Sequence, residues 1–207
     1  MNNLPNPFET PYNPRVFFDI AFKDKPIGRI IFELFLDKCP KTVENFRQFC
    51  TGEYKYEGKP IGYKGNQFHY IVKNSLIQGG DILNKNGTGC ISIYGYQFED
   101  ECLTIPHNKP GLLTMANSGP NSNGCQFIIT CSALNELDNH HVVFGEVVEG
   151  MTVVRMIENC IVNESYEPIA PITIIECGQM WFLFNIELFE LFNWVIFVSF
   201  EFNSSKK

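Results

Sequence analysis

The sequence predicts a mainly β protein, a closed antiparallel β-barrel capped by two α-helices, and two observations carry this prediction. The first is a series of short runs rich in β-branched and aromatic residues, separated by turns that contain Gly, Pro, Asn or Asp. The second is that only two segments place apolar residues at helical spacing. Many short strands with few helices are typical of closed β-architectures. A hydrophobic fraction of 44% is sufficient for a core in a chain of 207 residues.

The first two predicted strands are residues 16–22 and 29–35, which are rich in Val, Ile and Phe. The connection between them contains Asp24, Pro26 and Gly28, residues that are typical of a hairpin. We therefore expect these strands to pair in antiparallel fashion.

A short amphipathic helix is predicted over residues 39–52. Pro40 fits the first helical turn, and Val43 and Phe46 fall on one face at helical spacing. Gly52 can end the helix in a left-handed conformation.

The rest of the barrel is predicted from shorter signals. Residues 53–67 are rich in Gly, Lys and Tyr and predict an exposed loop, whereas residues 152–159 predict the second helix. The remaining strands are predicted at 68–72, 77–80, 112–116, 126–131, 142–147 and 172–177.

Composition divides the chain into three parts. Residues 1–14 form a proline-rich N-terminal extension, and residues 15–180 hold every predicted strand and helix. Residues 181–207 form a hydrophobic C-terminal tail. One folded domain with two appended segments is the organisation that the sequence predicts.

The tail is open to three interpretations. Fifteen of the twenty residues from 181 to 200 are apolar, a length that could span a bilayer. Glu187 and Glu190 lie near its middle, where an acidic residue costs about 2.5–3.5 kcal/mol on insertion scales. The tail is therefore a membrane anchor, a segment that packs on the barrel or on a partner, or a non-native end of the reading frame such as a translated intron.

The charge of the chain argues against direct binding of nucleic acid. The formal net charge is -7, the isoelectric point is about 5.1, and no cluster of Lys and Arg offers a surface for phosphates. The first residues contain no apolar run of the kind found in secretory signals, so we expect the protein in the cytoplasm or nucleus.

Neither a disulfide framework nor a metal centre is predicted. The eight cysteines lack CxxC spacing, and an intracellular protein keeps its thiols reduced. The four histidines also lack the spacing of a metal site; they are His69, His107, His140 and His141. We expect no metal, no cofactor and a monomeric protein.

The segment from 111 to 132 contains a loop made almost wholly of Asn, Ser, Gly and Pro between two apolar runs. Its uncharged amides can each donate and accept hydrogen bonds, which suits recognition of a peptide backbone. These amides belong to Asn117, Asn121, Asn123 and Gln126. The sequence therefore predicts a peptide-binding loop.

Several long segments, in order, resemble the cyclophilins: FHYIVKNSLIQGGD (68–81), NGTGCISIYG (86–95), FEDE (98–101), ANSGPNSNGCQF (116–127) and HVVFGEVVEGM (141–151). The resemblance spans residues 15–180. It implies an eight-stranded antiparallel barrel with two capping helices, and an outer groove that binds Xaa-Pro segments of proteins. It also implies peptidyl-prolyl cis-trans isomerase activity, which assists protein folding without a cofactor.

Two further segments, VENFRQFCTGE (43–53) and GKPIGYKG (58–65), are most similar to the cyclophilin associated with spliceosomal small ribonucleoproteins. This similarity implies spliceosomal partners.

The resemblance also implies which residues line the groove. Gln78 and Asn117 match positions that hold the substrate backbone, and Leu137 and His141 match the walls of the proline pocket. A structural histidine at the start of a strand is the alternative interpretation of His141. The other matching positions are Gly87, Ala116 and Gln126.

At five positions the sequence departs from the cyclophilin pattern. Tyr70 replaces the catalytic arginine, and a tyrosine hydroxyl lacks the charge and forked reach of a guanidinium. Ser75 and Ile128 replace phenylalanines of the pocket, and Leu76 stands where methionine is common. Glu136 replaces the rim tryptophan, so cyclosporin-type ligands are not expected to bind.

These departures leave two hypotheses for function. The first is an isomerase with weakened catalysis, and the second is a non-catalytic module that binds proline-containing partners, as in a spliceosome.

Cys50 and Cys177 match a redox-linked pair of some divergent cyclophilins that carry an inserted loop like residues 54–61, which implies a disulfide between them.

Overall fold

A computed structural model of the protein describes residues 13–180, and both the proline-rich residues 1–12 and the C-terminal tail lie outside the described part. The three interpretations of the tail therefore stay predictions. Within the described part, no helix is long and apolar enough to cross a membrane.

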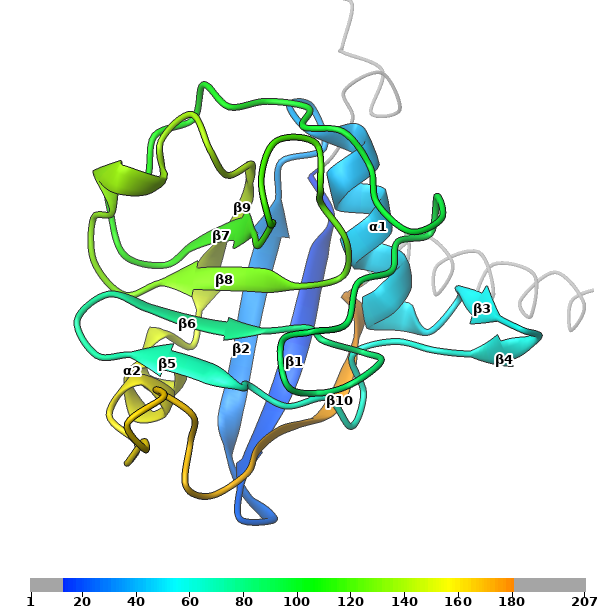
Figure 1. The fold of residues 1–207 in the computed structure, drawn as a ribbon. Helices are drawn as coiled ribbons and strands as arrows, with labels where there is room; N and C mark the ends of the chain where they lie inside the picture. The colour runs from blue at the N-terminus through cyan, green and yellow to red at the C-terminus, as the bar shows by residue number, and fades with distance from the viewer. Residues whose placement is uncertain (1–12, 181–207) are drawn as a thin grey trace, which may run out of the picture.

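The described residues form ten strands, two α-helices and one short 3-10 helix, η1 (Figure 1). In chain order the elements are β1 (Arg15–Phe22), β2 (Lys25–Leu34), α1 (Pro40–Thr51), β3 (Lys55–Tyr56), β4 (Lys59–Pro60), β5 (Tyr70–Val72), β6 (Leu76–Gly79), β7 (Leu112–Met115), β8 (Phe127–Thr130), η1 (Asn135–Leu137), β9 (Val143–Glu149), α2 (Met151–Glu158) and β10 (Ile172–Met180).

Eight of these strands in the described chain make one antiparallel sheet, in the order β10-β1-β2-β9-β7-β8-β6-β5. The sheet curls on itself, and the helices α1 and α2 lie on opposite sides of it (Figure 1). The prediction of a mainly β fold with two capping helices is confirmed, as is the hairpin between the first two strands.

The prediction of a closed barrel is wrong. The sheet is open, because no ladder of hydrogen bonds joins its edge strands β5 and β10. Residues 65–68 bond to β10, through contacts such as the one from the Phe68 N–H to the Ile172 carbonyl at 3.1 Å. From His69 onward the chain pairs with β6, and the outer edge of β5 bonds instead to the Tyr166 carbonyl, through the Ile71 N–H at 2.9 Å. The loop around Tyr166 occupies the place where a closing strand would pair.

The core is dominated by aromatic side chains from distant parts of the chain. The ring of Phe46 on α1 lies 5.0–6.1 Å, centroid to centroid, from five other rings. The contacts with Phe32, Phe127 and Phe144 are edge-to-face, and such contacts add about 0.5–1.5 kcal/mol each beyond the burial of area. The five partners are Phe18, Phe32, Tyr63, Phe127 and Phe144.

Helix α1 begins and ends as the sequence predicts, but its first turn is capped from elsewhere. Pro40 occupies the first position and Gly52 takes a left-handed φ of 72°. The carboxylate of Glu101 accepts hydrogen bonds from the N–H groups of Lys41 (2.9 Å) and Thr42 (2.6 Å). An acidic side chain at this end is favoured by the helix dipole.

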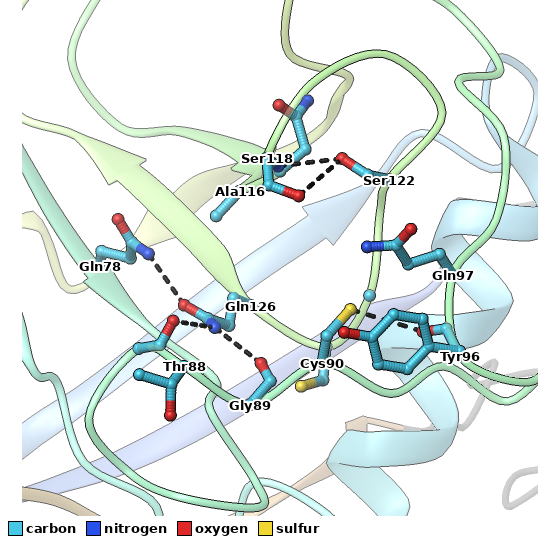
Figure 2. Close-up of a pocket in the computed structure, with 14 residues that line it drawn as sticks. Gln78, Thr88, Gly89, Cys90, Tyr96, Gln97, Ala116, Ser118, Ser122 and Gln126 are labelled. Carbon is cyan, nitrogen blue, oxygen red and sulfur yellow. Dashed lines mark hydrogen bonds between the residues drawn. The ribbon is translucent and has the colours of Figure 1, made fainter.

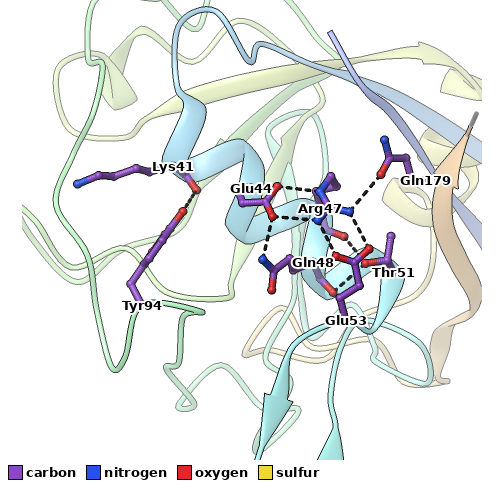
Figure 3. Close-up of polar contacts among 8 residues, drawn as sticks. All are labelled: Lys41, Glu44, Arg47, Gln48, Thr51, Glu53, Tyr94 and Gln179. Carbon is purple, nitrogen blue, oxygen red and sulfur yellow. Dashed lines mark hydrogen bonds and ion pairs between the residues drawn. The ribbon is translucent and has the colours of Figure 1, made fainter. Parts of the chain in front are cut away.

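The other end of α1 is held by Arg47, whose guanidinium bridges two carboxylates (Figure 3). It makes paired hydrogen bonds to Glu44 on the helix and to Glu53 beyond it, and a further bond to Gln179 on β10 at 3.1 Å. The bonds to Glu44 and then Glu53 raise the pKa of Arg47. This arrangement anchors the start of the inserted hairpin of β3 and β4.

The expectation of an exposed loop over residues 53–67 is only partly correct. The β3–β4 hairpin is exposed, but Tyr63 and Asn66 are buried. The Tyr63 hydroxyl donates to the carbonyl of Cys125 at 2.7 Å, and its ring joins the aromatic core. A tyrosine among glycines and lysines gives no local signal of burial, because its partners lie elsewhere in the sequence.

All eight cysteines lie within the described residues and all are free thiols. Cys50 and Cys177 border the same pocket of about 410 Å³ without forming a disulfide. Burial raises the pKa of Cys177 to about 12 and that of Cys50 well above its usual value. The expectation of reduced thiols and the pairing of these two cysteines both stay predictions.

We predict that Tyr63→Phe destabilises the fold by about 1–3 kcal/mol, because it leaves the buried Cys125 carbonyl without its donor. Urea unfolding followed by circular dichroism measures the change. Tyr56→Phe is the matched control, since Tyr56 is 45% exposed on the hairpin. Equal midpoints for the two variants would show that this buried hydrogen bond adds nothing to stability.

Candidate functional site

A row of side chains crosses the outer face of three neighbouring strands. Tyr70 on β5 is paired with Gln78 on β6, and Gln78 is paired with Ile128 on β8. Directly opposed residues share a face of the sheet, so these three side chains lie side by side. Their neighbours Ile71 and Ile77 point to the opposite face and are buried in the core.

A chain of amide hydrogen bonds begins at Gln78 in this row (Figure 2). The Gln78 Nε2 donates to Oε1 of Gln126 at 2.9 Å. The Gln126 Nε2 donates in turn to the carbonyls of Gly87 (2.9 Å) and Gly89 (2.7 Å). We call this set Gln78, Gln126, Gly87 and Gly89 the amide relay. It holds three predicted site residues, Gln78, Gly87 and Gln126, in one fixed arrangement.

The loop that supplies the two carbonyls is shaped by the buried carboxylate of Asp81. Its two oxygens accept hydrogen bonds at 2.8–3.1 Å from five backbone N–H groups, those of Leu83, Asn84, Asn86, Gly87 and Gly89. Burial alone would raise the pKa of Asp81, but the backbone hydrogen bonds outweigh it, so the pKa lies below 3.8. The carboxylate is therefore ionised and fixes the relay.

A side chain at Gly87 would be strained and tightly packed. The φ of Gly87 is +90°, and a Cβ there would lie 3.0 Å from Nε2 of His69. Both ring nitrogens of His69 are buried without a hydrogen-bond partner among the described residues, and burial lowers the pKa of this histidine. His69 is therefore uncharged and packs against the loop at Gly87.

A pocket of about 190 Å³ opens beside the relay. Gln78 and Gln126 lie on one side of it and Gln97 on the other (Figure 2). Five predicted site residues line it: Gln78, Gly87, Ala116, Asn117 and Gln126. The lining also includes Thr88, Cys90, Tyr96, Ser118 and Ser122. Amides, hydroxyls and backbone groups prevail, and such groups bind a peptide backbone without a charge.

The remaining predicted residues lie outside this pocket, on strands β5, β6 and β8, in the turn before β6, on η1 and before β9. They are Tyr70, Ser75, Leu76, Ile128, Glu136, Leu137 and His141. Ile128 is 5% exposed, Glu136 is exposed, and the others are half-buried. The predicted site is therefore an amide-lined pocket and a second group of residues outside it, of which Leu76, Ile128 and Leu137 are apolar.

Asn117 joins the amide-rich loop to the segment before β9. Its Nδ2 donates to the His140 carbonyl at 2.7 Å, and its Oδ1 accepts from the Gly119 N–H at 3.2 Å. His141, which follows His140, has its Nδ1 atom 2.9 Å from the Met115 carbonyl oxygen. Because a carbonyl can only accept, Nδ1 carries the hydrogen and donates it. Burial lowers the pKa of His141, so its ring is neutral near pH 7.

No group of three or more His, Cys, Asp or Glu side chains among residues 13–180 could hold a metal ion.

A sequence model of the family described as cyclophilin type peptidyl-prolyl cis-trans isomerase/CLD matches residues 17–179. The chain is 56% identical over 171 residues to the peptidyl-prolyl cis-trans isomerase CYP22 of Arabidopsis thaliana, covering 82% of this chain and 86% of the relative. This chain belongs to the cyclophilin family. It is also 52% identical to peptidyl-prolyl cis-trans isomerase 11 of Caenorhabditis elegans, over 82% of this chain and 93% of the relative. Peptidyl-prolyl cis-trans isomerase H of Rhizopus delemar is 54% identical, over 81% and 94% of the two chains.

Part of this pocket was not predicted from sequence. Thr88 and Gly89 lie inside a motif already assigned to the family, so the motif could have indicated them. Tyr96 and Gln97 follow a turn that gives no functional signal, and they reach the pocket only through the fold.

A buried polar network behind the groove was also missed. The His107 ring bonds through Nδ1 to Asp138 (2.9 Å) and through Nε2 to the Thr114 hydroxyl (3.1 Å). The Thr114 hydroxyl also bonds to the Val142 carbonyl, and the His107 N–H bonds to Asp138 at 2.7 Å. Hydrogen bonds from the His107 backbone and then its ring lower the pKa of Asp138. This network holds η1 against the sheet.

We predict that Asp81→Asn destabilises the cyclophilin at pH 7 by on the order of 3 kcal/mol, because an amide cannot replace both acceptor oxygens. The folded pKa of Asp81 is depressed, so its contribution is complete above pH 3.8 and is lost as the pH falls through the lower native pKa. Urea midpoints of both proteins should therefore converge in strong acid.

Glu149→Gln, which changes an exposed carboxylate on β9, is the control and should keep the wild-type midpoint within about 0.5 kcal/mol. A wild-type midpoint for Asp81→Asn at pH 7 would contradict the role given to this carboxylate.

Proposed function

We propose that this cyclophilin-type peptidyl-prolyl cis-trans isomerase binds Xaa-Pro segments across the row of Tyr70, Gln78 and Ile128, and turns them over more slowly than family members with arginine at position 70. The observation that carries the proposal is the register that puts a tyrosine directly beside Gln78 and the amide relay.

The reaction requires rotation about an amide bond whose barrier is about 18–20 kcal/mol, owing to resonance. No nucleophile is needed. An enzyme lowers the barrier by gripping the proline ring in a dry pocket and by donating a hydrogen bond to the prolyl nitrogen as it becomes pyramidal. Groups that hydrogen-bond the neighbouring backbone prevent the other end of the Xaa-Pro bond from rotating with the proline.

In the proposed arrangement, Gln78 and Asn117 hold the substrate backbone, since each retains an amide N–H that no contact above uses. The proline ring packs on Ile128, with Leu137 and His141 as walls and Ser75 and Leu76 beyond. This seat is shallower and more polar than one floored by phenylalanine.

The loss of catalysis follows from the donor at position 70. A tyrosine hydroxyl donates one neutral hydrogen bond, whereas arginine donates several charged ones. A hydrogen bond to a charged group is worth about 1.5–3 kcal/mol, so its absence lowers the rate by about one to two decades. The ring of Tyr70 also packs edge-on against Tyr166, at 5.6 Å between centroids, which holds it near the outer edge of β5.

A second candidate is a non-catalytic module that binds proline-containing partners, including proteins of the spliceosome. Two features favour it: the altered positions Tyr70, Ser75, Ile128 and Glu136, and the similarity of segments 43–53 and 58–65 to spliceosomal cyclophilins. We place the protein in the cytoplasm or nucleus as a monomer. Capture of small ribonucleoproteins from nuclear extract, together with no exchange on a short Ala-Pro peptide, would favour this candidate.

We predict that Tyr70→Arg raises kcat/KM on an Ala-Pro peptide about 10- to 100-fold, because it restores a charged hydrogen-bond donor. Adding Ile128→Phe should raise kcat/KM further, because it restores an aromatic ring to the proline pocket. NMR exchange spectroscopy measures the rate without a coupled protease. Tyr56→Arg adds the same charge to the exposed hairpin and should change nothing. The proposal fails if the unaltered protein already matches an ordinary cyclophilin.

We predict that peptide affinity is constant at neutral pH and falls in acid, because the bound proline further shields His141 and opposes its protonation. The pKa of His141 lies below 6.5, so the loss begins only below that pH. Fluorescence titration with a labelled proline peptide measures it. The variant His141→Phe lacks this histidine but keeps His69, and its peptide affinity should not depend on pH in this range. If its affinity falls in acid as in the unaltered protein, another group is responsible for the pH dependence.

A further inference from the structure

Two cysteines from distant parts of the sequence meet at the N-terminal end of α1. Cys39 is the residue immediately before the helix and is fully buried. Cys102 is partly exposed in the loop after Glu101. Because Glu101 bonds to the N–H groups of Lys41 and Thr42, the loop that carries Cys102 is fixed against the helical turn that follows Cys39.

The two side chains are close enough to influence each other's acidity, because their interaction raises the pKa of Cys39 and lowers the pKa of Cys102. Each sulfur also has a partner of its own: Cys39 Sγ donates to the Val143 carbonyl at 3.5 Å, and Cys102 Sγ lies 3.2 Å from the Thr104 hydroxyl. A buried thiol and a partly exposed thiol therefore lie at the same end of α1, where Glu101 holds the two segments together.

The surroundings of the two thiols differ in the way that peroxide chemistry requires. Hydrogen bonds, first of all with Thr104, lower the pKa of Cys102, and the ammonium of Lys38 is close enough to interact with it. Burial raises the pKa of Cys39 to about 12. The thiolate is the nucleophile in thiol oxidation, so Cys102 is the reactive member.

The remaining cysteines do not share these properties. All eight lie within the described residues, and burial raises the pKa of the other six: Cys50, Cys90, Cys125, Cys131, Cys160 and Cys177. A pair such as Cys50 and Cys177 therefore contains no activated thiol.

We propose that Cys39 and Cys102 form a peroxide-reactive dithiol, in which Cys102 is oxidised first and Cys39 resolves it to a disulfide. The Cys102 thiolate attacks one oxygen of hydrogen peroxide, the O–O bond breaks, and the hydroxide released is protonated to water. The Cys39 sulfur then attacks the Cys102 sulfenic acid, and its proton leaves with the displaced hydroxyl as a second water. Two thiols lose two electrons and one peroxide gains them; a dithiol reductant reverses the change.

The proposed bond lies one loop away from the substrate groove. Asp100, in the same loop, bonds with the Asn121 backbone and side chain at 2.9 and 3.0 Å and with the Asn123 side chain at 2.7 Å. Oxidation would thus tie the start of α1 to the segment that braces the amide-rich loop. The chemistry depends on the thiols alone and not on isomerase activity.

The test is oxidation of the reduced full-length chain with hydrogen peroxide at pH 7, followed by blocking of free thiols, digestion without reduction, and mass spectrometry. We expect a cross-linked pair of peptides that contain Cys39 and Cys102, two hydrogens lighter than the separate peptides, which dithiothreitol separates. In Cys39→Ser, oxidation should stop at a sulfenic acid on Cys102, which dimedone traps. Cys160→Ser, at another partly exposed cysteine, should leave the cross-link unchanged.

The unaltered protein gives a second readout that does not depend on the folding of any variant. Maleimide should label Cys102 on the order of tenfold faster than Cys160, because its thiolate is more populated. Equal labelling rates, a stable sulfenic acid on Cys102 of the unaltered chain, or a cross-link from Cys102 to a different cysteine would each overturn the proposal.

Discussion

The ring of Phe127 is the point at which the core fixes the groove. It contacts the rings of Phe18, Phe46, Tyr63 and Phe68 at centroid distances of 5.3–5.9 Å, and it is fully buried. Side chains alternate along a strand, so a residue held this firmly inward forces its two neighbours outward. Those neighbours are Gln126, in the amide relay, and Ile128, in the row with Gln78 and Tyr70. The site is thus an outward consequence of core packing.

The groove is consequently built from two kinds of support. Its polar half is preorganised, because Asp81 fixes the loop, the loop carbonyls fix Gln126, and Gln126 fixes Gln78. Its apolar half depends on the outer faces of β6 and β8 and on η1, which His107 and Asp138 hold from behind. The substitutions at Tyr70, Ser75 and Ile128 affect the apolar half and the donor beside it, and leave the polar half intact. In the proposed function, recognition of a backbone and acceleration of its rotation therefore depend on different residues.

The sequence predicted most of what local patterns determine. The strand 16–22 is observed as Arg15–Phe22, and the helix 39–52 as Pro40–Thr51, because alternation and capping are local signals. Tyr63 was misjudged because its burial depends on Cys125, far along the chain. Closure was misjudged for a similar reason: counting strands does not reveal that the Tyr166 loop takes the outer edge of β5.

At the candidate site, the motifs predicted the amides of the polar half but not how they are joined. The contact of Gln78 with Gln126 follows from the register of β6 on β8, which no local pattern contains. The pocket residues Tyr96 and Gln97, the capping carboxylate of Glu101 and the meeting of Cys39 with Cys102 likewise depend on tertiary structure.

The amide relay also has a direction. The carbonyls of Gly87 and Gly89 can only accept, so both hydrogens on Nε2 of Gln126 must point to them and its Oε1 must face Gln78. A flip of either amide would set like atoms against each other, and the order of donors and acceptors at Gln78 is therefore locked. An extended peptide presents its own N–H and C=O groups in an order that reverses with the direction of the chain. A groove whose donors and acceptors have a fixed order thus distinguishes the two directions in which a peptide could lie. This selection does not depend on the side chains of the peptide.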